Sequence, residues 1–282
     1  MQKDKDFSFN TSSSSENFIS LDQTNSIETF CEIANQLSVS VLFFEDITIS
    51  ERNTMILNIE SRPYNVFSPS FVYEQLKNEH TSNERIKDGF NKFLIAKENN
   101  SIIVATRKTL FESTKDELMR ALSKNRRQYE IISVNTNNKD LLKWVAHDRR
   151  LDYISIDLRS KPSIIDNALC SLVKQNSKCF EIILSPLLLS DNNKDFSSII
   201  RTGKKIMKLI LSYNAPFIFT MCPQTPMQMR SGKLLRYIGE LLGVPFNKSK
   251  LAVFDYQLST LVDNTVKLHE NYVFKGVKEV IG

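Results

Sequence analysis

The sequence has little of what most phosphate and metal sites are built from. Only 7 of its 282 residues are glycine, and neither of the common glycine-rich phosphate loops is present. Its 3 histidines lie far from one another and from every cysteine, so zinc fingers and the His-x-His and H-E-x-x-H metal motifs are absent. These absences argue against glycine-loop nucleotide binding and against a histidine-based metal site.

Cysteine and long apolar runs are also scarce. The 4 cysteines form no C-x-x-C pair and no signal-peptide pattern is present, which predicts reduced thiols in a cytosolic compartment and excludes a disulfide scaffold. No apolar run approaches the roughly 20 residues that a membrane-spanning helix needs. We therefore expect no membrane partner.

What the sequence does contain is typical of a folded domain with a large core. Hydrophobic residues make up 41% of the chain and charged residues 24%. The 37 Lys and Arg outnumber the 32 Asp and Glu, for a net charge of +5. This excess favours an acidic partner without identifying it, and it is also compatible with a plain soluble enzyme.

The order of apolar runs predicts a single α/β domain. Residues 1–16 are polar and serine-rich, so we expect a disordered tail there. From residue 17 to 282, β-branched runs alternate with amphipathic stretches, as in repeated βα units. The predicted strands are 18–21, 39–46, 101–106, 130–134, 152–157, 179–184, 216–221 and 251–255. The predicted helices are 26–37, 83–97, 114–126, 138–147, 163–175, 196–212, 231–242 and 256–268.

Eight βα units over roughly 250 residues predict a TIM-like β/α barrel with an irregular part. The segment from about 48 to 82 fits this pattern poorly. It contains TMILNIE, a possible extra strand, and two prolines, so we treat it as an insertion or an irregular unit.

A basic stripe is the clearest functional pattern. Arg201, Lys204, Lys205 and Lys208 fall within an arc of about 100° on one helix face, and isoleucines occupy the opposite face. One interpretation is an ordinary solvated face. The other is a ridge that binds nucleic-acid phosphates without reading bases.

Other cations lie at the ends of predicted elements. Arg107, Arg159 and Arg230 each follow a predicted strand, which in a βα barrel is the face where sites are built. Arg149 and Arg150 instead precede a strand, on the opposite face, where solvated helix-end cations are the simpler interpretation.

Glu181 lies inside an otherwise apolar strand, CFEIIL. A carboxylate there must be paired or protonated, because an isolated buried charge is too costly. We expect a buried pair with an arginine of a neighbouring unit, Arg159 or Arg201. The alternative is a general acid or base with a raised pKa.

Two further candidates depend on proximity that a sequence does not reveal. Glu45, Asp46 and Asp157 lie at strand ends and together could hold a divalent cation; solvated or arginine-paired carboxylates are the alternative. Cys222 follows a strand, but no histidine lies near it in the sequence to act as its base, so an inert thiol is the simpler interpretation.

The second half of the chain resembles one family. A strand DYISID is followed by a helix, a strand with FEIILSPLLL, a basic helix containing Arg201, another strand, an M-R-S turn into a helix, and L-G-V-P. This order resembles the thirty-kilodalton protein subunit of archaeal and eukaryotic nuclear ribonuclease P. The closing YVFKGV also resembles that family, and the resemblance is best over residues 130–282.

The resemblance implies a noncatalytic protein with a barrel like that of the PHP metallohydrolases, without their metal ligands. It implies binding to the ribonuclease P RNA, which carries the Mg²⁺-dependent removal of the 5′ leader from precursor tRNA. The protein itself would hold no cofactor and no metal, and would contact precursor tRNA only indirectly. A smaller ferredoxin-like subunit and other ribonuclease P proteins are the implied partners. The implied location is the cytoplasm for an archaeal protein and the nucleus for a eukaryotic one.

At the positions that match the resemblance, we expect RNA contacts from six cations and no catalytic residue. They are Arg201, Arg230, Arg107, Arg159, Lys204 and Lys205. Arginine suits this role because its planar group can bond two phosphate oxygens at once. The alternative function is a TIM-like or PHP-like metal-dependent phosphohydrolase acting on a small phosphorylated substrate, with Glu45, Asp157 and Glu181 as ligands or acid–base groups.

Overall fold

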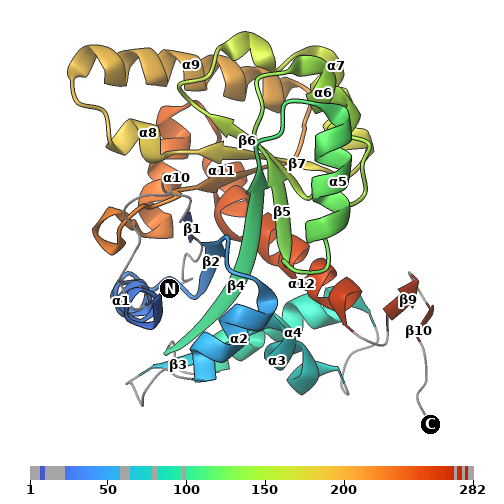
Figure 1. The fold of residues 1–282 in the computed structure, drawn as a ribbon. Helices are drawn as coiled ribbons and strands as arrows, with labels where there is room; N and C mark the ends of the chain where they lie inside the picture. The colour runs from blue at the N-terminus through green and yellow to red at the C-terminus, as the bar shows by residue number, and fades with distance from the viewer. Residues whose placement is uncertain are drawn as a thin grey trace.

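The chain folds around one curled sheet of parallel strands, flanked by helices on both faces (Figure 1). The structure is a computed structural model that describes residues 7–9, 23–57, 64–77, 82–96, 100–269, 272–274 and 277–278. The sheet strands are β1 (Phe7–Phe9), β2 (Val41–Glu45), β3 (Asn65–Phe67), β4 (Ser101–Leu110), β5 (Ile131–Val134), β6 (Tyr153–Asp157), β7 (Cys179–Ile183) and β8 (Phe217–Thr220).

The strand order is β1-β2-β4-β5-β6-β7-β8, and β3 pairs with Ser101–Ile103 at the start of β4, on the edge of β4 opposite to β2. All of these pairs are parallel, and β1 and β8 form the two ends of this path. The sheet is therefore an open half-barrel. The predicted α/β fold and irregular TIM-like barrel are confirmed.

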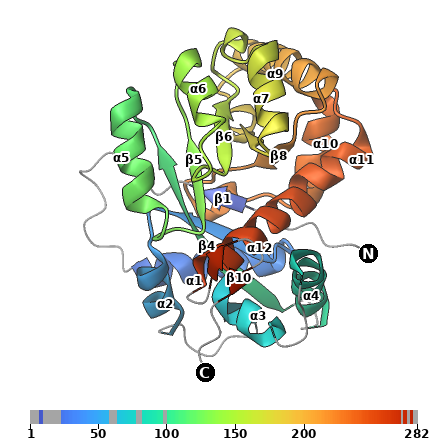
Figure 2. The same cartoon turned by 90° about the vertical axis from the view of Figure 1, so that its right-hand side faces the viewer.

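Helices that follow the strands cover the outer face of the sheet (Figure 2). They are α1 (Gln23–Gln36), α5 (Lys115–Asn125), α6 (Lys139–Val145), α7 (Asn167–Gln175), α9 (Asn193–Ser212) and α10 (Gly232–Leu241). Their apolar stripes pack on outward-facing strand residues such as Leu42, Val104 and Phe180. Short helices α8 (Ser185–Leu188) and α11 (Phe246–Lys250) extend this layer.

The inner face of the sheet is filled by other helices. α12 (Tyr256–Leu268), α3 (Pro69–Leu76) and α4 (Asn83–Ala96) pack there. Leu258, Leu261 and Val262 of α12 contact the cluster that contains Phe43 and Ile103 of the sheet. Because both faces are buried, the strands are apolar on consecutive residues, as the sequence predicted. No helix in the described ranges is long and apolar enough to span a membrane.

Six predicted strands and all eight predicted helices are present, with ends that differ by a few residues. The predicted strand 18–21 lies outside the described residues. Within the predicted disordered tail, Phe7–Phe9 form β1, which differs from the prediction for these three residues. The rest of 1–16 lies outside the described ranges.

The predicted strand 251–255 is wrong, because Leu251–Asp255 form a π-helical turn that leads into α12. A short apolar run such as LAVFD does not distinguish a strand from a buried helix. The turn packs beside β8, and Gln257 donates a hydrogen bond from Nε2 to the Phe219 carbonyl at 3.1 Å. The side-chain amide of Gln257 thus bonds the edge of β8 that does not pair with β7. In a closed barrel another strand would pair with this edge.

The irregular segment 48–82 contains α2 (Ile49–Leu57), β3 and α3. The possible extra strand at TMILNIE is wrong for residues 54–57, which belong to α2, and residues 58–60 lie outside the described ranges. Arg52 anchors α2: it is fully buried, donates to the Val104 carbonyl at 2.7 Å and pairs with Glu130 at 2.9 Å.

Candidate nucleic-acid interface

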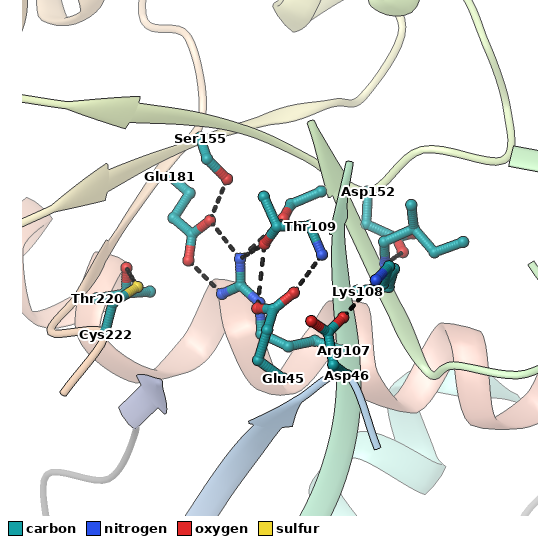
Figure 3. Close-up of polar contacts among 12 residues, drawn as sticks. Glu45, Asp46, Arg107, Lys108, Thr109, Asp152, Ser155, Glu181, Thr220 and Cys222 are labelled. Carbon is teal, nitrogen blue, oxygen red and sulfur yellow. Dashed lines mark hydrogen bonds and ion pairs between the residues drawn. The ribbon is translucent and has the colours of Figure 1, made fainter. Parts of the chain in front are cut away.

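A polar layer lies inside the half-barrel near the carboxyl ends of the strands, where βα barrels carry their active sites (Figure 3). Side chains alternate along a strand, so one inward-facing polar set arises from six strands of this sheet. Its members are Glu45, Arg107, Thr109, Ser133, Ser155, Glu181 and Thr220, and all are buried.

Arg107 is the centre of this layer. Its Nε lies 2.8 Å from Glu45 Oε2, its Nη1 lies 2.5 Å from Glu181 Oε1, and its Nη2 lies 2.9 Å from Glu181 Oε2. The pair with Glu181 is therefore bidentate, the geometry that suits guanidinium and carboxylate. One cation joins β2, β4 and β7.

Hydroxyl groups complete the network. Nη2 of Arg107 also donates to Thr109 Oγ1 at 3.0 Å and to Ser133 Oγ at 2.8 Å, and Ser155 donates to Glu181. Glu45 accepts from the backbone N–H of Thr109. These bonds compensate much of the cost of removing three charged groups from water.

The two carboxylates respond differently to this setting. Burial raises the pKa of Glu45, and the nearby charge of Arg107 does not fully offset it. Burial also opposes ionisation of Glu181, but the charge and hydrogen bonds of Arg107 outweigh it and lower the pKa of Glu181. The pKa of Arg107 is raised well above its ordinary value because both glutamates outweigh its own desolvation. Arg107 and Glu181 are therefore a stable ion pair at neutral pH.

The sequence correctly predicted that Glu181 pairs with an arginine, but the partner was wrong. Arg107 holds it, rather than Arg159 or Arg201. Arg107 is also a correction to the expected RNA contacts. It lies within β4 rather than after a strand, is 2% exposed, and directs its guanidinium at two carboxylates, so no phosphate can reach it.

The carboxylates proposed for a metal have separate partners. Glu45 contacts Arg107, Asp46 pairs with Lys108 at 2.5 Å, and Asp157 accepts from the backbone N–H of Arg159 at 2.7 Å. Among the described residues, no group of three His, Cys, Asp or Glu could hold a metal ion. The donor set therefore does not fit the metal centre of a hydrolase: a guanidinium fills the position between the two glutamates.

Cys222 lies beside this layer. Its Sγ is 3.6 Å from Thr220 Oγ1, and its backbone has a positive φ of 44°.

The basic stripe is a ridge on the outer side of α9. Arg201, Lys204, Lys205 and Lys208 are all exposed, while Ile199, Gly203, Ile206, Met207 and Ile210 are buried. Asp195, in the first turn, is the only acidic residue of α9. We call these four cations the α9 ridge.

Gly203 lets α9 lie close against the rest of the barrel. A Cβ atom at this position would lie 2.8 Å from Cδ2 of Leu242, just beyond the end of α10. The close approach fixes the orientation of the helix, so its basic side faces solvent.

The remaining two predicted cations differ from each other. Arg159, after β6, is exposed. Arg230, after β8, is half-buried, and its Nη1 donates to the carbonyls of Met227 and Met229, each at 2.8 Å. Arg230 therefore holds its own loop, and only part of its guanidinium faces outward.

Comparison with known proteins gives one family. The family described as RNase P subunit p30 matches residues 43–269. No curated protein sequence matches the chain.

Solved structures share the fold. A chain in a cryo-EM structure of archaeal ribonuclease P with mature tRNA aligns with a TM-score of 0.61 and 14% identity, covering 99% of this chain and 98% of that one. A Xaa-Pro dipeptidase with bound methionine aligns with a TM-score of 0.50 and 10% identity, covering 93% of this chain and 76% of that one. At these identities the likeness concerns the fold alone.

The Arg107 network makes a prediction about stability. Replacing Glu181 with Gln removes one carboxylate of a buried pair, and we expect a loss of about 3–5 kcal/mol in the free energy of unfolding at pH 7. Because the folded-state pKa of Glu181 is lowered, its contribution is complete above the unfolded pKa of about 4.3 and is lost as pH falls through the folded value. The difference between wild type and Glu181→Gln should therefore shrink below about pH 4. Urea unfolding over a pH series measures it.

Glu45→Gln is the matched control. Burial raises the pKa of Glu45, so its ionised form is costly in the folded state, and its replacement should cost less at pH 7 than that of Glu181. Equal losses in the two variants, or a Glu181→Gln loss that does not change with pH, would contradict the assignment of roles.

Proposed function

Since the chain belongs to the RNase P subunit p30 family, it is a protein subunit of ribonuclease P, and we propose that it binds the catalytic RNA of that enzyme. In this role it supports removal of the 5′ leader from precursor tRNA. We propose that it is noncatalytic, with the RNA carrying the chemistry.

The observation that carries this proposal is the α9 ridge. Four exposed cations lie on one side of a 20-residue helix, with no acidic residue among them. Arg201, the adjacent pair Lys204 and Lys205, and Lys208 follow one another at steps of three residues, so the charge advances about 4.5 Å along the helix axis at each step. Such a row can follow closely spaced phosphates, which gives affinity and orientation without reading bases. Arg159 and the outward part of Arg230 are the other proposed contacts.

The proposed mechanism is neutralisation of phosphates. A folded RNA core brings phosphates together, and their repulsion must be offset by Mg²⁺ or by protein cations. Arg201, Lys204 and Lys205 would supply part of that charge, so the RNA would fold at a lower Mg²⁺ concentration. We propose that Mg²⁺ acts through the RNA and that the protein holds no cofactor of its own. The pairing of Glu45 and Glu181 with Arg107 supports this, because these carboxylates already have a cation.

The phosphohydrolase alternative has less support. It needs Glu45, Asp157 and Glu181 to act together on a metal or substrate, and they have separate protein partners instead. Phosphatase activity and bound metal in purified protein without RNA would favour it.

We further propose that the chain works with the smaller ferredoxin-like subunit that its family resemblance implies. An apolar stripe on α10 supports a protein contact: Leu234, Tyr237 and Leu241 recur at helical spacing and are 36%, 52% and 47% exposed. Exposed aromatic and aliphatic residues of this kind commonly form the centre of protein interfaces. The proposed compartment is that of the enzyme, the cytoplasm in archaea or the nucleus in eukaryotes.

The α9 ridge gives the first test of this function. We expect Arg201→Gln, Lys204→Gln and Lys205→Gln together to raise the Mg²⁺ requirement of reconstituted cleavage and to lower the salt slope of RNA binding by roughly 2–3, at about 0.7–0.9 per lost phosphate contact. The control is Arg85→Gln, Lys87→Gln and Lys92→Gln on α4, which removes the same charge elsewhere. Equal behaviour of the two triple variants would remove the α9 ridge from the RNA interface.

The α10 stripe gives a separate test. Tyr237→Ser with Leu241→Ser should weaken the complex with the ferredoxin-like subunit at least about tenfold, because interface aromatics contribute more than about 1.4 kcal/mol. Titration of the purified proteins measures this. Leu57→Ser, at an 84% exposed leucine of α2, is the matched control. Unchanged affinity in the double variant would place the partner elsewhere.

A further inference from the structure

The ends of three helices form a second basic surface. Helices run antiparallel to the strands they follow. The C-terminal ends of α5, α6 and α7 therefore all lie at the amino-terminal ends of β5, β6 and β7. Four exposed cations lie at these ends: Lys124 and Arg127 at α5, Arg149 after α6, and Lys174 in the last turn of α7. We call this group the helix-end surface.

Hydrogen bonds show that the three ends adjoin one another. Arg150, after α6, donates from Nη1 to Ser123 Oγ of α5 at 2.5 Å. His147, also after α6, contacts Asn176 at the end of α7 through Nδ1 and Nδ2 at 3.3 Å. The helix-end surface is therefore continuous in space, although its residues are spread over some 50 positions of the sequence.

The acidic residues of this region are already neutralised. Asp148 pairs with Arg150 at 2.6 Å, and Asp152 pairs with Arg126 at 2.7 Å. Within the described part of the chain, none of the four exposed cations has an acidic side chain within 4 Å. The helix-end surface thus presents four uncompensated positive charges.

Hydrogen bonds to backbone carbonyls do not occupy these four cations. Lys124 and Lys174 lie in the last turns of α5 and α7, where a cation interacts favourably with the helix dipole, but the cations that bond carbonyls nearby are more buried ones. Arg126 donates to the Glu130 carbonyl at 3.1 Å, and Lys178 donates to the Leu151 carbonyl at 2.7 Å. Lys124, Arg127, Arg149 and Lys174 have no such bond in the described ranges and extend into solvent.

The composition of the surface favours RNA over protein. Protein interfaces usually have an apolar centre, whereas from α5 to α7 only Met119 is a large hydrophobic residue that is exposed. Adjacent lysines and arginines with no apolar centre are typical of phosphate contacts. We propose that the helix-end surface is a second RNA-phosphate site, in addition to the α9 ridge. This inference rests on the proposed RNA-binding function and extends it to a second stretch of RNA backbone.

The test is a charge-removal variant of the full-length chain. Lys124→Gln, Arg127→Gln, Arg149→Gln and Lys174→Gln are combined, and binding to the RNA that co-purifies with the chain is measured over a salt series. We expect the slope of log K against log salt to fall by roughly 3, at about 0.7–0.9 per contact. The matched control combines Lys77→Gln, just after α3, with Arg85→Gln, Lys87→Gln and Lys92→Gln on α4, and it should leave the slope unchanged. Arg127→Lys with Arg149→Lys keeps the charge and should retain binding.

The outcomes separate this inference from the proposed function. If the α9 triple variant lowers the slope and the helix-end variant does not, the second site is wrong and the function stands. If neither variant lowers it, both are wrong. If the α3–α4 control lowers the salt slope equally, the effect reflects the net charge of the protein and not a particular surface, and the second site is wrong. If the helix-end variant loses binding to a poly-glutamate peptide but binds RNA as before, the surface binds acidic protein. That outcome also overturns the second RNA site.

Discussion

The interior of this half-barrel depends on one buried arginine. Arg107 reaches from β4 to Glu45 on β2 and to Glu181 on β7, so a single side chain connects strands that lie on both sides of its own. Each partner would be too costly to bury alone. When all three are present, Arg107 and the two glutamates connect β2, β4 and β7 of the open sheet through ion pairs. This guanidinium holds both Glu45 and Glu181 at the end of the sheet where many βα barrels carry their catalytic groups.

This arrangement separates two tasks. Charges inside the sheet are matched and fixed, whereas charges on α9 and at the helix ends are exposed and unmatched. Interior pairing stabilises the sheet, and its charges are buried away from solvent. The outer cations can then face a polyanion without competition from neighbouring carboxylates. A protein subunit that supports an RNA catalyst needs both properties.

The sequence predicted most elements because both faces of the sheet are buried and the helices are amphipathic. It failed at LAVFD, since a run of four apolar residues has no period that distinguishes a π-helical turn from a strand. Burial cost alone showed that Glu181 needs a cation. That this cation is Arg107 could be known only from the register of the sheet, which brings Arg107 and Glu181, 74 positions apart, into contact. One signal was available: β4 continues past residue 106, and Arg107 then alternates inward with Ile103 and Ala105. The α9 ridge followed from spacing within one helix, but the helix-end surface depends on how three helices pack.

The position of α12 in the chain has a consequence for how the protein is made. The inner face of the sheet is covered by α3 and α4, which precede β4 in the chain, and by α12, which the ribosome delivers after every strand from β2 to β8. Until Leu268 has left the exit tunnel, the nascent chain lacks the part of this apolar cover that α12 supplies. Such intermediates aggregate readily, so synthesis of this protein places a demand on chaperones that its finished form does not reveal.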